Sequence, residues 1–171
     1  ENAWRKPRDL SKVPFVYHDM KDFEHKIIYY ESSRGCPFSC SYCLSSIDKC
    51  LRFRNLDLVK EELQFFIDHK VPQVKFVDRT FNCKHDHAMA IWSYIMEHDN
   101  GVTNFHFEVS ADLLNEAELE LMSHMRPGLI QLEIGVQSTN EQTIHEIRRT
   151  MKFEEVARIV KRINSYGNIH Q

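Results

Sequence analysis

Apolar and polar residues alternate along three short segments of the chain, at residues 73–77, 104–110 and 129–134. Alternation with a period of two places the apolar side chains on one face of a strand and the polar ones on the other. Residues 26–30 are rich in isoleucine and tyrosine, which favour strands. The pattern therefore predicts four β-strands.

Between and after these strands, apolar residues recur at the 3.6-residue spacing of an amphipathic helix. Val59, Leu63 and Phe66 share one face of the first helix. Either Asn55 or Asp57 can cap its first turn. The other helices are expected over residues 85–98, from a cap at Asn115 to a stop at Pro127-Gly128, over residues 140–149 and over residues 153–165.

Strands and helices alternate with short connections, an order that produces parallel strands joined by right-handed crossovers. Both an open Rossmann-type sheet and a piece of a (β/α) barrel satisfy this order. A doubly wound sheet buries both faces and has nearly continuous apolar strands, whereas three of these strands have one polar face. We therefore expect an α/β fold: a partial (β/α) barrel of about four parallel strands, with helices on the outer face.

Composition indicates a globular domain and argues against nucleic-acid-binding and membrane proteins. The 171 residues suit a single domain of ordinary globular composition, with 42% hydrophobic and 27% charged residues. The formal charge of −3 lacks the basic excess of a general nucleic-acid-binding or membrane-surface protein. No apolar run approaches the roughly 18 residues of a membrane span, and no Walker or GxGxxG motif is present. We expect neither a nucleic-acid partner nor a membrane partner.

The two ends of the chain do not have the pattern of domain termini. Residues 1–25 contain two prolines and show no clear period, so we expect a linker or N-terminal arm there. The chain begins with Glu1 and ends just after a turn-like segment at residues 165–167. We therefore expect a piece of a longer protein, with residues 26–171 forming a truncated core domain.

Cysteine spacing carries the strongest chemical signal. Cys36, Cys40 and Cys43 lie within eight residues, and the total of five cysteines is odd, with no secretory signal. These features favour a metal or redox site in a reducing compartment such as the cytoplasm over disulfides. Three thiolates of one loop can surround one small inorganic centre. A [4Fe–4S] cluster usually takes four cysteines, so three leave one iron open.

The arrangement Cys36-x3-Cys40-x2-Cys43 after a first strand, with Tyr42 before the third cysteine, resembles the radical S-adenosylmethionine (SAM) superfamily. The resemblance extends from about residue 26 to the end. It implies that the open iron binds the amino and carboxylate groups of SAM. Reductive cleavage of SAM would then produce a 5′-deoxyadenosyl radical that abstracts a hydrogen atom from a substrate. Tyr42 would pack beside the adenine.

The resemblance also implies positions that bind the cosubstrate. Asp78, after the second strand, would lie near the methionyl amine, and Glu108 and Ser110, at the end of the third strand, near the ribose. Gln137 belongs to a Gly-Val-Gln segment that resembles the family's ribose motif.

Twelve residues after Gln137, Arg149 would bind the methionyl carboxylate, since a guanidinium offers a forked pair of donors. Arg148 is the neighbouring alternative for this role.

Residues 30–38 and 77–82 most resemble radical SAM proteins that follow a cobalamin-binding domain, which include methyltransferases and proteins like the anaerobic Mg-protoporphyrin ester cyclase. The resemblance implies a [4Fe–4S] cluster, SAM and cobalamin bound by a separate domain as cofactors. It also implies a small-molecule substrate and an electron donor such as flavodoxin or ferredoxin.

Two alternatives remain open at this stage. A coproporphyrinogen III oxidase-like enzyme would have a further cysteine where Ser45 stands. A non-catalytic domain could use the same cysteines for zinc, although structural zinc sites usually have four ligands. The sequence Cys83-x-His85-x-His87 could form a second metal site, but a polar, solvated helix start explains it more simply.

Overall fold

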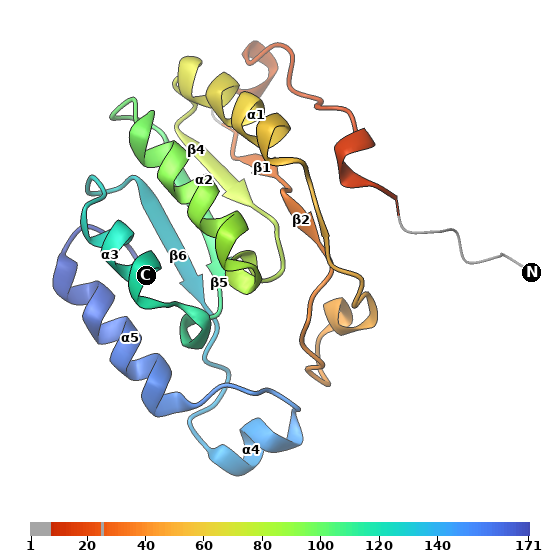
Figure 1. Ribbon diagram of the computed structural model, residues 1–171, viewed down its shortest axis with the longest axis vertical. Coiled ribbons are helices and arrows are strands. Elements are labelled where there is room, and N and C mark those ends of the chain that lie inside the picture. The colour runs from red at the N-terminus through yellow and green to blue at the C-terminus, as the bar shows by residue number, and fades with distance from the viewer. Residues whose placement is uncertain (1–7, 25) are drawn as a thin grey trace, which may run out of the picture.

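A four-stranded parallel sheet forms the centre of the computed structural model, which describes residues 8–24 and 26–171 (Figure 1). The strands are β1 (Ile28–Tyr30), β4 (Gln73–Phe76), β5 (Asn104–Val109) and β6 (Ile130–Ile134), and they lie in this order across the sheet. The four predicted strands and their parallel direction are thus confirmed. The order follows the chain, as expected when each crossover returns beside the preceding strand.

The predicted helices are present. They are α1 (Leu56–Asp68), α2 (His85–Glu97), α3 (Glu116–Ser123), α4 (Glu141–Glu146) and α5 (Phe153–Tyr166). Three of them, α2, α3 and α4, end earlier than expected, and α5 extends one residue further. Asn55 caps α1 and Asn115 caps α3 through a capping box with Glu118, as their side chains favour. Helix α3 ends at Ser123, before Pro127, and residues 124–129 form the irregular connection to β6. Short 3-10 helices cover Leu10–Lys12, Lys21–Phe23, Leu44–Ile47, Phe81–Cys83 and Ala111–Leu113.

Helices α1, α2, α3 and α5 cover the apolar face of the sheet, where the core lies, and α4 lies beyond the ends of the strands (Figure 1). Phe76 of β4 and Phe107 of β5 pack with ring centroids 4.5 Å apart, and Trp92 of α2 meets Phe107 edge-on at 5.9 Å. The opposite face carries the polar side chains of β4, β5 and β6, which are partly buried except for the exposed Glu133. One apolar and one polar face is the arrangement of a partial barrel with its helices outside.

Two strands that we did not predict bracket the cysteines. Strand β2 (Ser33–Arg34) pairs antiparallel with β3 (Arg52–Phe53), so the chain leaves the sheet and returns at one point. Strands of two residues carry no periodic signal, which is why the sequence pattern did not reveal them. The 17 residues between them, 35–51, are called the cysteine loop below.

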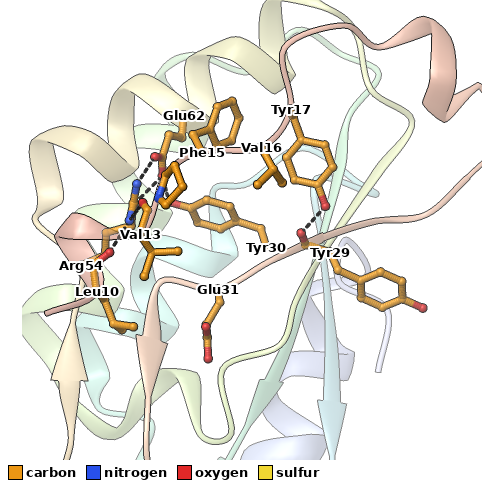
Figure 2. Close-up of a pocket in the computed structure, with 11 residues that line it drawn as sticks. Leu10, Val13, Phe15, Val16, Tyr17, Tyr29, Tyr30, Glu31, Arg54 and Glu62 are labelled. Carbon is orange, nitrogen blue, oxygen red and sulfur yellow. Dashed lines mark hydrogen bonds and ion pairs between the residues drawn. The ribbon is translucent and has the colours of Figure 1, made fainter. Parts of the chain in front are cut away.

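The N-terminal arm packs on the core in its described part. Phe15 lies edge-on to Phe66 at 5.4 Å, and Tyr17 donates a hydrogen bond to the Tyr29 carbonyl at 2.6 Å. Arg54, buried, donates to the Leu10 and Val13 carbonyls and forms an ion pair with Glu62 (Figure 2). Residues 1–7 and 25 of the predicted linker lie outside the described residues.

At the other end of the chain, His170 follows α5 and forms a parallel bridge with Gln131 beside β6. Its carbonyl accepts a hydrogen bond from the Leu132 amide at 2.8 Å. The chain thus returns to the edge of the sheet after α5. Within residues 8–24 and 26–171, none of the helices combines the length and the apolar character that crossing a membrane requires.

Candidate active site around the cysteine loop

The cysteine loop is folded back on itself near its two ends. The Cys36 amide donates to the Asp48 carbonyl at 3.0 Å. Gly35 has φ +97°, and a Cβ there would lie 2.6 Å from the Cys50 carbonyl oxygen. Only glycine permits both this backbone conformation and this close approach. The tight crossing sets the direction in which Cys36 enters the loop.

All three predicted ligand cysteines line one cavity of about 150 Å³. The other lining residues are Phe38, Tyr42, Ser45, Ser46, Arg79, Thr80, Glu108 and Arg149. Arg79 and Thr80 lie three and four residues after the end of β4, and Glu108 lies near the end of β5. The cavity is therefore at the carboxyl ends of the strands, where βα loops build the active sites of (β/α) barrels.

Arg149 connects the cysteine loop to the end of β6. Its Nη1 donates to the Tyr42 hydroxyl at 3.2 Å, and its Nη2 donates to the Gly135 carbonyl at 2.6 Å. The Ser41 amide donates to the Ile147 carbonyl at 2.9 Å, a second link between the same two segments. These contacts hold the guanidinium at the cavity wall.

One donor of that guanidinium is still free. Arg149 Nε is buried and has no hydrogen-bond partner among the described residues. A buried donor without a partner is costly, and a guanidinium that lines a cavity is suited to bind an anion there. Arg148, by contrast, is exposed, has φ +54° and does not line the cavity. The geometry therefore favours Arg149 over Arg148 as the anion-binding residue.

Glu108 joins the cavity to a charged patch on the polar face of the sheet. Lys75 Nζ lies 3.9 Å from Glu108 Oε1 and donates to Glu133 Oε2 at 3.0 Å. The hydrogen bond to Glu133 raises the pKa of Lys75, and the same bond lowers the pKa of Glu133. His106 Nε2 lies 3.2 Å from Glu133 Oε2 without hydrogen-bonding geometry, and burial lowers its pKa. Lys75 and Glu133 thus form an ion pair on this face of the sheet, and Lys75 also lies near Glu108.

Three predicted residues do not line the cavity. Ser110 is buried, and its hydroxyl donates to Asp112 at 2.6 Å. Gln137 is exposed with φ +67°, and its amide folds back over Gly135. Asp78 is completely buried beneath the cysteine loop. The cosubstrate roles of these three residues stay predictions.

Arg79 and Thr80 line the cavity but were missing from the predicted set. Thr80 Oγ1 lies 3.8 Å from Cys36 Sγ. Their position in the loop that follows a barrel strand was the available signal.

The second candidate metal motif is not assembled. His85 Nδ1 lies 3.0 Å from Glu118, and His87 is buried against Ser32 instead of being solvated at the helix start as predicted. Across the described ranges 8–24 and 26–171, no group of three or more His, Cys, Asp or Glu side chains could hold a metal ion.

The donor chemistry around the cavity nevertheless suits an iron–sulfur cluster. Cys36, Cys40 and Cys43 are free thiols of one loop, and thiolates are the usual protein ligands of iron–sulfur clusters. The cavity also contains a guanidinium donor without a partner and a carboxylate. The residues present therefore fit a cluster together with a small polar molecule that carries an anionic group.

Comparison with known proteins identifies a family and two similar folds. The model of the Radical SAM superfamily matches residues 30–170. The fold resembles the cobalamin-dependent S-adenosylmethionine radical enzyme OxsB, with a TM-score of 0.77 and 16% identity over 96% of this chain and 26% of that chain. It also resembles the radical SAM methyltransferase TsrM from Kitasatospora setae, with a TM-score of 0.73 and 16% identity over 95% of this chain and 33% of that chain.

A curated relative has a short matching segment. A 2-(S-pantetheinyl)-carbapenam-3-carboxylate methyltransferase from Streptantibioticus cattleyicolor is 33% identical over 54 residues, which are 30% of this chain and 8% of that protein. The chain thus spans a third or less of each of these relatives.

Proposed function

The chain belongs to the radical SAM superfamily, and from that premise we propose that it is a SAM-cleaving core that binds a [4Fe–4S] cluster through Cys36, Cys40 and Cys43. The observation that carries the proposal is the single cavity lined by these three cysteines, Glu108 and Arg149. When bound, the cluster supplies the electron that breaks the C5′–S bond of SAM, which leaves methionine and a 5′-deoxyadenosyl radical.

The residues of the cavity would bind and orient the cosubstrate. Arg149, held by Tyr42 and Gly135, would bind the methionyl carboxylate through its guanidinium. Glu108 offers acceptors to the ribose hydroxyls. Fixing SAM at both ends holds its C5′ in one position beside a substrate, which radical transfer requires.

The proposal extends to the class of reaction. OxsB and TsrM are cobalamin-dependent or cobalamin-bound radical SAM enzymes, and the curated relative is a methyltransferase. We propose a cobalamin-dependent methyltransferase or cyclase-like protein that acts on a small molecule. An electron donor such as flavodoxin or ferredoxin would reduce the cluster in the cytoplasm, where the five thiols stay reduced. Cobalamin in the purified full-length gene product would support this extension, and a product that neither contains nor binds cobalamin would contradict it.

Anaerobic reconstitution with iron and sulfide tests the core of the proposal. We expect about four irons per chain, and with dithionite and SAM we expect equal amounts of methionine and 5′-deoxyadenosine. Cys36→Ala, Cys40→Ala and Cys43→Ala should each lose the iron. Cys50→Ala is the matched control, because Cys50 is an exposed thiol of the same loop that does not line the cavity. Tight binding of zinc without iron would contradict the proposal.

A further inference from the structure

Asp78 is the centre of a buried hydrogen-bond network below the cysteine loop. Its Oδ2 accepts the Ser32 amide at 3.0 Å, and its Oδ1 accepts the Ser32 hydroxyl at 2.7 Å and the Ser33 hydroxyl at 2.5 Å. Ser32, Ser33 and Asp78 are 0%, 3% and 0% exposed, so no solvent competes for these bonds. Both carboxylate oxygens are therefore engaged within the protein.

His87 of α2 completes the network. Its Nε2 lies 3.0 Å from Ser32 Oγ. The single hydroxyl proton of Ser32 goes to Asp78, so Nε2 must carry a proton and donate it to Ser32 Oγ. Burial lowers the pKa of His87 to about 4, so the ring is neutral at pH 7 and protonated on Nε2 alone. His87 thereby fixes the direction of the Ser32 hydroxyl.

The serines stand where the chain enters the cysteine loop. Ser33 pairs with Phe53 in the β2–β3 ladder, and the Ser32 carbonyl accepts the Arg54 amide at 2.8 Å. Both ends of the loop are thus tied together here, and Asp78 ties this junction to the end of β4. Two residues after Asp78, Thr80 Oγ1 lies 3.8 Å from Cys36 Sγ. One short segment therefore holds the base of the loop and touches its first cysteine.

We propose that Asp78 is a positioning residue: through Ser32 and Ser33 it anchors the cysteine loop to the carboxyl end of β4 and so sets the place of Cys36 at the cavity. This role deepens the proposed function and replaces contact with the methionyl amine as the role of Asp78, because its carboxylate has no exposed oxygen to offer a cosubstrate. That the loop binds an iron–sulfur cluster rests on the proposed function. That Asp78 anchors the loop rests only on the hydrogen bonds of this chain.

Amide hydrogen exchange of the protein without iron, measured at pH 7, tests the anchor directly. In Asp78→Asn an amide replaces an acceptor of three hydrogen bonds, so we expect exchange over residues 32–36 to become about tenfold faster or more. Ser33→Ala, which removes one donor and no charge, should have a smaller effect on the same segment. In His87→Gln we expect exchange over residues 32–36 to stay close to the wild-type rate, since the glutamine amide can still donate to Ser32 Oγ. In His87→Phe we expect faster exchange, since this donor is lost.

Glu118→Gln provides a matched control. Glu118 is also 0% exposed, and it accepts the Asn115 amide at 3.0 Å in the capping box of α3, away from the cysteine loop. We expect this variant to speed exchange near residue 115 and to leave residues 32–36 unchanged. Equal acceleration of both segments in both variants would show global destabilisation and overturn the anchor, as would unchanged exchange at residues 32–36 in Asp78→Asn.

Iron retention then connects the anchor to the cluster. After reconstitution, Asp78→Asn and Ser33→Ala should lose iron to a chelator faster than wild type, and Glu118→Gln should not. Equal rates of loss in all four proteins would overturn the link to Cys36. If wild type itself takes up no iron, the proposed function fails, while the exchange experiment still decides whether Asp78 anchors the loop.

Discussion

Arg149 donates a hydrogen bond from Nη1 to the hydroxyl of Tyr42 at 3.2 Å, although 107 residues separate them in the chain. The contact joins the cysteine loop to the segment after α4, and both side chains line the cavity. It holds the Arg149 guanidinium at the cavity that the cysteines line, and within residues 8–24 and 26–171 Arg149 Nε has no hydrogen-bond partner. The cationic side chain of Arg149 and the three cysteines therefore line the same cavity.

Removing this cation should weaken cosubstrate binding without removing iron. Arg149→Ala is expected to cost about 1.5–3 kcal/mol, the range for a charged hydrogen bond, or roughly ten- to a hundredfold in SAM affinity. Equilibrium dialysis with reconstituted protein measures the affinity, and iron analysis is the accompanying readout. Arg148→Ala is the control, since Arg148 does not line the cavity. If only Arg148→Ala weakens binding, the carboxylate site is assigned to the wrong arginine.

The Tyr42 hydroxyl should matter through Arg149. Tyr42→Phe keeps the ring and removes only the acceptor of the Arg149 hydrogen bond. We expect a loss of SAM affinity of about 0.5–1.5 kcal/mol. In the Arg149→Ala background the same change should have almost no effect, because the coupled partner is gone. Additive losses in the double variant would show that the hydroxyl acts independently of Arg149.

Hydrophobic periodicity and helix-capping residues were sufficient to predict most strands and helices of the fold. The alternation in residues 104–110 identified β5, and Asn55 and Asn115 cap the helices that their positions predicted. Parallel order then brings the strand ends together, which is why Glu108 could be expected at the cavity, whereas Arg149 was expected there only from the resemblance to the radical SAM family. Strand alternation, helix caps and strand order depend on residues that are close together in the chain, so they can be predicted from one sequence.

Contacts between distant segments could not be predicted in this way. Nothing in the local sequence shows that Asp78 is satisfied by serines about 45 residues earlier. The burial of His87 did have a signal, since it lies four and eight residues before Ile91 and Ile95 on the buried face of α2. We expected a solvated side chain there because histidine is polar.

The Asp78–His87 pair predicts opposing effects of pH on stability. Burial raises the pKa of Asp78 from 3.8 to about 6, so the folded state favours the protonated carboxyl. The stability that this preference adds is lost as pH rises from about 4 to 6. Burial lowers the pKa of His87 from 6.5 to about 4, so its contribution is lost as pH falls through that range. Between pH 4 and 6 the two slopes oppose each other.

His87→Gln should expose the contribution of Asp78. Its stability relative to wild type should decrease as pH rises from 4 to 6.5, by at most about 3 kcal/mol for a difference of about 2.5 pKa units. Urea unfolding of both proteins at several pH values measures the difference. A stability difference that does not change with pH would contradict a neutral, buried His87.

The N-terminal arm should depend on one buried ion pair. Arg54→Met leaves the Glu62 carboxylate buried without its cation and removes the donors to the Leu10 and Val13 carbonyls. We expect a loss of about 3–5 kcal/mol in the free energy of unfolding, and faster proteolysis in residues 9–23. Arg34→Met removes an exposed pair with Glu31 and should cost less than about 1 kcal/mol. Similar losses in both variants would show that the buried pair has no special role.

Glycine at position 35 should be essential to the cysteine loop for a reason that Gly101 does not share. Both residues have positive φ, +97° and +75°, so alanine costs about 1–2 kcal/mol of backbone strain at either position. At Gly101 a Cβ meets nothing within 4 Å, whereas at Gly35 it lies 2.6 Å from the Cys50 carbonyl oxygen and 3.2 Å from that of Asp48.

Gly35→Ala must therefore push residues 48–50 away and strain the hydrogen bond from the Cys36 amide to the Asp48 carbonyl. Because the other atoms at the contact are backbone, no side-chain rotation relieves it. We expect Gly35→Ala to lose more stability than Gly101→Ala in urea unfolding and to lose iron uptake, while Gly101→Ala keeps full iron uptake. Full iron uptake by Gly35→Ala would mean that the close crossing at the start of the loop does not set the position of Cys36.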